Sequence, residues 1–174
     1  MLNYTSPFRL QIIEALTTNL KTITPANGYQ LDLSGEGCVV RGRLFLGDDE
    51  PSIMVSILEP PVAIEPNKQQ VENKDSAGGW DLLIQGWAQD PINDPSAHPC
   101  DLAYVLAHDV RRALMKIKTA NKVRGSSRGD DILGFGLKIM DWKVGVPVVR
   151  PSEEVSGYGV FYMLLTMKIV EDLS

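Results

Sequence analysis

The segment from Trp80 to Lys118 constrains the fold of this chain more than any other. An apolar stretch, WDLLIQGWA, leads through a proline-punctuated turn, QDPINDPSAHP, into an amphipathic run, CDLAYVLAHDVRRALMKIK. Apolar residues on both faces of the first stretch predict a strand in the interior of a sheet. The three- and four-residue spacing of the last run predicts a long helix that covers one side of that sheet.

A second helix is expected near the start of the chain. Ser6 is a suitable N-cap, and Pro7 suits the first helical position because that position needs no N–H donor. Pro25 then ends the helix. Its apolar stripe comprises Ile12, Ile13, Leu16, Leu20 and Ile23.

The apolar period changes to two after this helix, which predicts a meander of strands at Tyr29–Leu33, Cys38–Leu46 and Ile53–Ile57. Arg41 and Arg43 alternate with the apolar residues of the second strand. Their face is therefore expected either to be solvated or to meet an acidic partner.

The chain is expected to close with a strand over residues 137–144, an extended connection over 146–156 and a long final strand over 157–170. One face of the final strand is apolar throughout, and the other is apolar up to Leu164 before Thr166 and Lys168 make it polar. Two helices cannot cover both faces of such a sheet. We therefore expect a neighbouring subunit on the uncovered side.

These elements predict a single domain over residues 1–174, a length that suits one hydrophobic core. The expected class is α+β: a mixed, mostly antiparallel sheet with two main helices packed on one face and long inter-strand loops. Flexible loops are predicted at about residues 59–79 and 119–135, where periodicity is lost. The first loop is either a partner-contacting arm or disordered.

Charge and composition limit the possible functions. A formal net charge of -5 argues against a general phosphate-binding surface, since nucleic-acid affinity depends on Lys and Arg. The apolar runs are shorter than the ~20 residues that a bilayer span needs. The N-terminus lacks the pattern of a secretory signal, so the cytoplasm is the expected compartment. Cys38 and Cys100 are predicted to be reduced thiols.

The sequence predicts no catalytic, cofactor or metal site, and hence no enzyme. His98 and His108 lack the spacing of a helical metal pair. The segment from His98 to Cys100 is better explained as a turn and helix start than as a catalytic dyad, although a small enzyme using it stays an alternative. His108 and Asp109, as consecutive helical residues, diverge by about 100° and are expected on a solvated face.

Three segments carry a resemblance to a known family: FRLQIIEALTTNLKTI, WDLLIQGWAQDPINDPSAHPCDLAYVLAHDVRRAL and VFYMLLTMKIVEDL. In their order and character the chain resembles the tail terminator, or tail completion, proteins of long-tailed bacteriophages, and it looks most like those of contractile-tailed phages. The likeness covers most of the chain as a pattern of elements, without a short diagnostic motif.

The resemblance implies a structural virion protein that forms a ring, commonly a hexamer, on the head-proximal end of the tail tube. Such a ring ends tail polymerisation and provides the docking interface to the head connector. The implied partners are other copies of the chain, the tail tube protein, the sheath and the head connector or neck protein. DNA would pass through the channel without specific binding, and assembly would take place in the host cytoplasm. Another neck protein, such as a head-to-tail adaptor or stopper, is the alternative.

Basic residues in the meander and in the two loops are the candidates for contacts with neighbouring subunits, the tube or the connector. For each of them a solvated surface position is the alternative. The candidates are Arg41, Arg43, Lys68, Lys74, Arg124 and Arg128.

Overall fold

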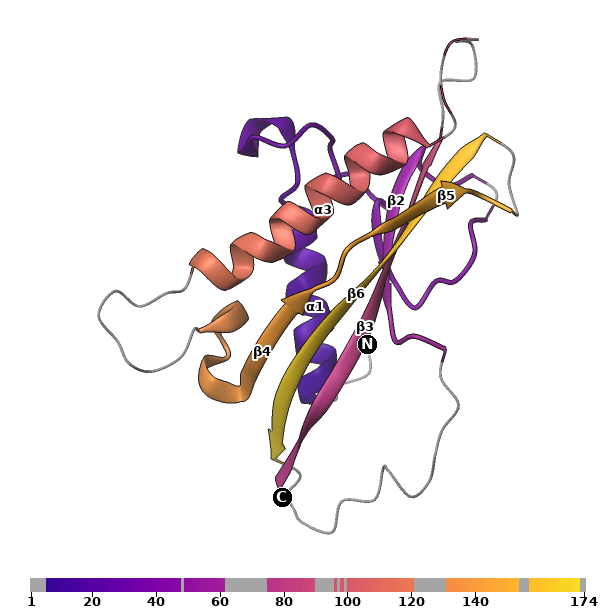
Figure 1. The fold of residues 1–174 in the computed structure, drawn as a ribbon. Coiled ribbons are helices and arrows are strands. Elements are labelled where there is room, and N and C mark those ends of the chain that lie inside the picture. The colour runs from indigo at the N-terminus through magenta and orange to yellow at the C-terminus, as the bar shows by residue number, and fades with distance from the viewer. Residues whose placement is uncertain are drawn as a thin grey trace.

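The computed structural model describes residues 6–47, 49–61, 75–89, 96, 98, 100–120, 131–153 and 157–172. A twisted sheet carries two helices, α1 and α3, on one side (Figure 1). This arrangement confirms the predicted α+β class. In chain order the elements are α1 (Phe8–Leu20), a 3₁₀ turn (Pro25–Asn27), β1 (Val39–Arg41), β2 (Ile53–Leu58), β3 (Asp75–Gln89), α3 (Asp101–Ala120), two 3₁₀ turns (Ile132–Gly134 and Gly136–Lys138), β4 (Ile139–Val144), β5 (Val148–Pro151) and β6 (Tyr158–Asp172).

The sheet has the strand order β1-β2-β3-β6-β4, and β5 also pairs with β6. Strand β3 pairs with one edge of β6. Strands β4 and β5 both pair with the other edge, at opposite ends of β6. Only β1 and β2 are parallel, and every other pair of neighbours is antiparallel. The sheet is therefore mixed and mostly antiparallel, as predicted.

Strands β3 and β6 form the centre of the sheet. Each has 15 residues, and they pair along their whole length. Gly86 stands opposite Phe161 in this ladder, and a Cβ atom at Gly86 would overlap the phenyl ring. The bare backbone of Gly86 thus makes room for a fully buried aromatic ring, which fixes the register of the two strands.

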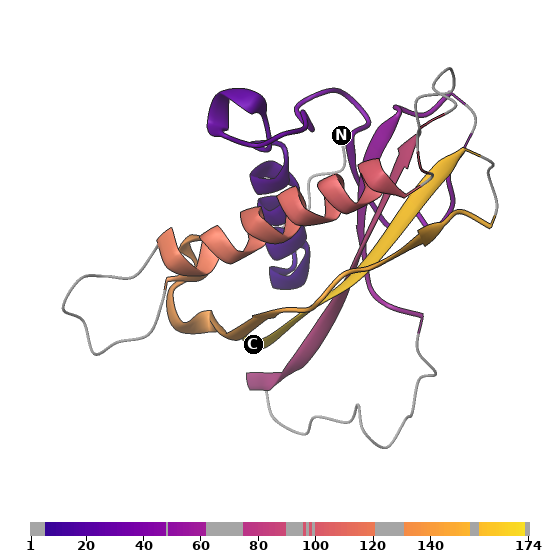
Figure 2. The same cartoon turned by 45° about the horizontal axis from the view of Figure 1, so that its top comes forward.

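The helices cover one face of this sheet, as both views show (Figure 2). From α1 come Ile12, Leu16 and Leu20, and the stripe of α3 packs beside them. The apolar face of β6 from Phe161 to Ile169 lies beneath, as predicted. The core shared by the two layers also includes Ala103, Leu106, Val110, Leu114, Ile117, Trp80, Leu82, Ile84 and Trp142.

The predicted strand at Tyr29–Leu33 is wrong, and so is the predicted solvated position of Asp109. Residues 29–33 form no strand, although Tyr29 and Leu33 are buried. The carboxylate of Asp109 is fully buried, and its Oδ2 accepts hydrogen bonds from the backbone N–H groups of Gln30 (2.8 Å) and Leu31 (3.0 Å). A side chain of α3 therefore supplies the acceptor that a neighbouring strand would have provided.

Two cationic side chains of α3 also contact the chain at Gly28 and Tyr29. Arg112 donates a hydrogen bond to the carbonyl of Gly28 (2.7 Å), and its guanidinium lies 5.2 Å from the centre of the Tyr29 ring. The ammonium of Lys116 lies 4.4 Å from that ring. Cation–π contacts and one buried carboxylate thus fasten the irregular segment to the helix.

The predicted strand at Cys38–Leu46 is shortened to Val39–Arg41, because Gly42 takes a left-handed conformation (φ 70) and turns the chain onto the face opposite the helices. There the N–H of Arg43 donates to Ser56 Oγ (3.0 Å), and the carbonyl of Leu44 accepts from Gln85 Nε2 (3.2 Å). Ser56 and Gln85 are buried polar residues of β2 and β3. We call the part of residues 42–50 that the structure describes the crossing segment.

Other predicted boundaries also need correction. Pro7, and not the predicted Ser6, takes the N-cap position of α1, without a side-chain cap. Residues 75–79, predicted as loop, pair with β6, because an opposing long strand overrides the weak strand preference of glycine and aspartate. Within predicted loop 119–135, α3 reaches Ala120 and residues 132–134 form a 3₁₀ turn. The connection at 146–156 contains β5. Residues 62–74 and 121–130 lie outside the described residues.

Replacing Asp109 with alanine should lower the free energy of unfolding by about 2–4 kcal/mol, because two N–H groups would lose a charged acceptor. Asp109→Asn keeps one oxygen acceptor and should lower the free energy of unfolding by less than Asp109→Ala does. Urea unfolding followed by circular dichroism measures both. Asp101→Ala, an exposed aspartate at the start of the same helix, is the control and should cost at most about 1 kcal/mol. Equal losses at the two positions would contradict the assigned role of Asp109.

Candidate interaction surfaces

The face of the sheet opposite the helices is covered only at one end in the described structure. A small buried cluster of Met54, Trp87 and Val160 lies there. It packs against Val40 of β1, Leu46 of the crossing segment, Tyr158 and Tyr162. Farther along, no described helix or segment packs over the sheet. We call this side the second face.

Exposed apolar side chains gather on the second face beside the covered cluster. Leu164 (46% exposed) faces Leu83 across the β6–β3 ladder, and Val148 (62% exposed) faces Tyr162 across the β5–β6 ladder. The guanidinium of Arg150 lies over the Tyr162 ring, 5.2 Å from its centre. These residues, Leu83, Val148, Tyr162 and Leu164, form what we call the open-face patch. It is the uncovered apolar strand face that the alternation in β6 predicts.

The crossing segment adds two further exposed apolar residues. Leu44 and Phe45 are 45% and 63% exposed, and the carbonyl of Leu44 is bonded to Gln85, which faces Tyr162 across the ladder. The alternation predicts Leu44 within the strand Cys38–Leu46, and this is wrong because the chain leaves the strand at Gly42. The polar Gln85 within an apolar strand was the one sequence signal that another segment must approach it.

A groove separates α1 from the edge of the sheet at β1. It has a volume of about 400 Å³, with apolar walls from Leu10 and Ile13 of α1 and Ile57 and Leu58 of β2. Glu14, Arg41, Gly42 and Glu59 complete its lining. No sequence pattern indicated this groove, because the nearest lining residues of its two sides, Glu14 and Arg41, are 27 positions apart in the chain.

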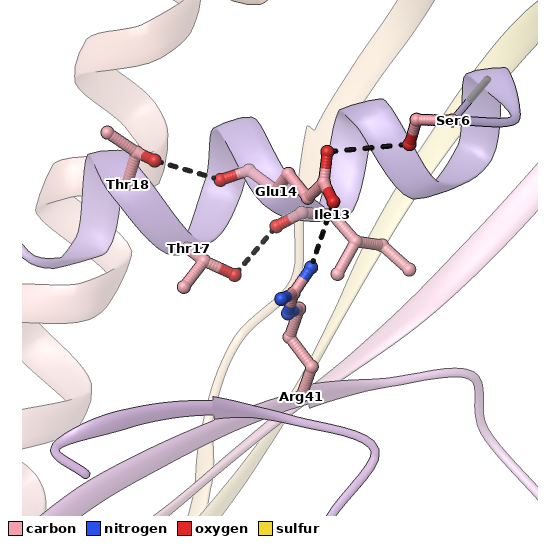
Figure 3. Close-up of polar contacts among 6 residues, drawn as sticks. All are labelled: Ser6, Ile13, Glu14, Thr17, Thr18 and Arg41. Atoms are coloured by element: carbon pink, nitrogen blue, oxygen red, sulfur yellow. Dashed lines mark hydrogen bonds and ion pairs between the residues drawn. The ribbon is translucent and has the colours of Figure 1, made fainter. Parts of the chain in front are cut away.

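The close-up in Figure 3 shows how α1 and β1 are joined beside this groove. Arg41 Nη1 reaches Glu14 Oε1 at 3.5 Å, and Glu14 Oε2 accepts a hydrogen bond from Ser6 Oγ at 3.5 Å. Thr17 and Thr18 turn their hydroxyls back to the carbonyls of Ile13 and Glu14, at 2.8 and 3.1 Å. The ion pair is exposed at both partners, so it orients the side chains and adds little stability.

The sequence-predicted interface residues divide into two groups. Arg41 faces α1, whereas Arg43 lies on the crossing segment and pairs with Glu50, so the two arginines do not share one face. Their common face was predicted from strand alternation, which ends at Gly42. Each arginine has an acidic partner within the chain. The other four candidates lie outside the described residues: Lys68, Lys74, Arg124 and Arg128.

A polar network at the N-terminal end of α1 was not foreseen. Arg9 Nε lies 3.1 Å from Glu171 Oε2 of β6, and its guanidinium lies 5.3 Å from the centre of the Trp80 ring. Trp80 Nε1 donates to Glu59 Oε1 at 3.0 Å. The network ties the helix to Trp80 within β3, to the end of β6 and to the residue that follows β2, and its partners are too distant in sequence to be paired by pattern.

His98 and Cys100 lie just before α3, whereas His108 and Asp109 lie within it. The carbonyls of His98 and Cys100 accept hydrogen bonds from the N–H groups of Asp101 and Tyr104, as expected for a turn and helix start. His108 Nδ1 lies 3.5 Å from Asp109 Oδ1, although this oxygen has no hydrogen-bond partner. Among the described residues, no group of three His, Cys, Asp or Glu side chains could hold a metal ion. None of the helices there is long and apolar enough to cross a membrane.

Comparison with known proteins does not place the chain in a family. No protein-family model matches it, and no curated protein matches it with significant similarity.

The two thiols should differ in reactivity. Burial, followed by the negative charge of Asp32, raises the pKa of the Cys38 thiol, so the folded protein keeps this thiol neutral at pH 7–8. In Cys100→Ser, modification of Cys38 by a disulfide reagent should be at least about tenfold slower than in urea. In the unfolded chain the thiol ionises near pH 8.5. Because its pKa is higher in the folded protein, the contribution of Cys38 to the free energy of unfolding is fully present below that pH and should decrease as the pH rises further.

Cys38→Ser, which leaves only the half-buried Cys100, is the matched variant for the same assay. Modification of Cys38 as fast in the folded protein as in urea would show that the thiol is accessible and ionised, contrary to this prediction.

Proposed function

We propose that the chain is a structural virion protein that forms a ring on the head-proximal end of a bacteriophage tail tube, ends tail polymerisation and offers a docking face to the head connector. The observation that carries the proposal is the open-face patch, because it gives a folded domain an apolar surface for a neighbouring subunit. The resemblance of three segments to tail terminator proteins supplies the tail as the place of assembly.

The order of elements supports the same proposal. The opening helix, the central strand with its following helix and the closing strand, which carry the resemblance, are α1, β3 with α3, and β6. Together they make up the shared core. A family likeness that rests on these elements therefore concerns the scaffold that would position every contact surface.

The charge balance also supports a ring around a DNA channel. A formal net charge of -5 on each subunit would repel phosphates, so DNA could pass without being held. The proposal assigns no catalysis to His98 or Cys100, and it requires no metal or cofactor.

Particles lacking the protein test the proposal most directly. The absence of a tail terminator should give overlong tails or tails that do not join heads, as seen by electron microscopy. Loss of a stopper would instead give heads that leak DNA, which would favour the alternative neck function. Purified protein should bind the ends of tail tubes. If the protein stays monomeric at high concentration and does not bind tube ends, the proposed role is excluded.

Subunit association should depend on the open-face patch. Leu164→Asp places a charge where an apolar contact is proposed and should weaken association by roughly thirtyfold per contact. Tyr104→Asp changes an exposed apolar position on α3 (59% exposed, against 46% for Leu164), is the matched control and should leave association unchanged. Mass photometry across a concentration series measures both variants. If Leu164→Asp assembles as the unaltered protein does, the patch is not the subunit contact.

A further inference from the structure

The outer side of α3 is positively charged, although the chain has a formal net charge of -5. Residues 102–120 of this helix contain four cations and one carboxylate. The carboxylate belongs to Asp109, which is fully buried and accepts hydrogen bonds from two backbone N–H groups. Three of the cations are exposed: Arg111, Arg112 and Lys116. Beyond the first residue of the helix, its exposed charge is therefore positive.

The two arginines of α3 differ from the other described arginines in their partners. Each described arginine outside this helix forms an ion pair with a glutamate of the same chain. Those four are Arg9, Arg41, Arg43 and Arg150. Within the described residues, Arg111 and Arg112 form no such pair. They are thus the arginines whose charge the described part of the chain does not balance.

Arg112 and Lys116 are held in position by the segment that Asp109 anchors. The guanidinium of Arg112 donates to the carbonyl of Gly28 (2.7 Å). It lies 5.2 Å from the centre of the Tyr29 ring, and the ammonium of Lys116 lies 4.4 Å from the same centre. Two like charges at one ring repel each other, and an anion that reached both would relieve this repulsion. Because the cations are already ordered, binding would also immobilise fewer side-chain torsions.

A hollow lies beside these cations, between the segment that follows α1 and the second half of α3. It has a volume of about 310 Å³, and Lys116 lines it together with Asn19, Thr22 and Asn27. The lining is completed by Tyr29, Ala113 and Ile117. Because amide, hydroxyl and ammonium groups surround the hollow, it suits a carboxylate better than an apolar side chain.

An exposed apolar side chain interrupts the cations of α3. Met115 lies between Arg111 and Arg112 around the circumference of the helix, since successive helical residues are about 100° apart. Its side chain is 46% exposed. A segment that crossed the helix there would therefore meet cations on both sides of an apolar contact. We call Arg111, Arg112, Met115, Lys116 and the adjoining hollow the basic face.

We propose that the basic face docks an acidic segment of another protein. Carboxylates of this segment would pair with Arg111, Arg112 and Lys116, and one carboxylate side chain would occupy the hollow. Charge complementarity identifies the partner, because ordered cations without balancing carboxylates call for an anionic ligand. The charges, contacts and exposure of the described residues carry this assignment without the proposed function.

Two other occupants fit the basic face less well. A second copy of the chain is a poor source, because its described glutamates other than Glu36 already pair with arginines of their own chain. Those glutamates are Glu14, Glu50, Glu59, Glu153 and Glu171. Single-stranded nucleic acid binds through exposed aromatic rings as well as cations, and the Tyr29 ring is only 8% exposed.

Charge reversal at the basic face tests the proposal. Fluorescence anisotropy would measure binding of a labelled oligoglutamate peptide to the whole chain at about 0.15 M ionic strength. Arg111→Glu combined with Lys116→Glu should bind at least about tenfold more weakly, because two attractions become repulsions. Lys143→Glu combined with Lys168→Glu makes the same change in net charge at exposed positions of β4 and β6. This control should stay within about threefold of the unaltered protein.

Nuclear magnetic resonance of the unaltered protein provides a second measurement that does not depend on the folding of any variant. Titration with the oligoglutamate peptide should shift the amide signals of Asn27, Gly28 and Lys116 and leave those of Val148 and Leu164 unchanged. An oligoglutamine peptide of the same length is the control. It should shift none of these signals, because it carries no side-chain charge.

The results that would overturn the proposal are distinct. Equal weakening by the two double variants would show that net charge, and not the basic face, governs binding. Tighter binding of a thymidine oligonucleotide of equal charge would make nucleic acid the partner. If the α3 double variant loses a self-association that mass photometry detects in the unaltered protein, a second copy supplies the acidic segment. Absence of oligoglutamate binding to the unaltered protein would refute the basic face as a docking site, whatever the outcome of the tail-tube assay.

Discussion

The rest of the structure depends on the pairing of β3 with β6 along 15 residues. A slip of one strand by one residue would turn its core-facing side chains to the other face of the sheet, so the register decides which side chains meet the helices. Gly86 and Phe161 make that register specific, because the phenyl ring occupies the space of a missing Cβ atom. With the register set, Trp80, Leu82 and Ile84 lie on the same side as Met163 and Leu165. The helices α1 and α3 then share one apolar floor.

The same pairing leaves the second face with both apolar and buried polar groups. Ser56 and Gln85 are buried there, and each needs a hydrogen-bond partner that the apolar neighbours cannot supply. The left-handed turn at Gly42 supplies these partners, because it brings the N–H of Arg43 to Ser56 and the carbonyl of Leu44 to Gln85. Coverage extends only as far as the crossing segment reaches. The open-face patch is thus the part of a two-faced sheet that one short segment does not cover.

Much of the scaffold could be predicted from the sequence, because its elements have regular periods. The spacing in α3 and the alternation in β6 identified both elements, the covered face and the apolar residues around Leu164 on the uncovered one. The errors arose where a distant partner decides the local backbone. Tyr29, Leu31 and Leu33 alternate like a strand, but their segment is fastened by Asp109, nearly 80 residues away. Arg41 and Arg43 also alternate with apolar residues, but the left-handed turn at Gly42, between them, ends the strand. The groove beside α1 depends on three-dimensional neighbours and has no local signature.

Two unlike surfaces matter for a ring, because a closed ring of more than two members joins one patch to a different patch on the next copy. The open-face patch and the groove beside α1 are two unlike surfaces of this chain. An apolar patch demands matching shape over several side chains. Under the proposed function, the shape of the open-face patch would therefore set the angle between neighbouring subunits.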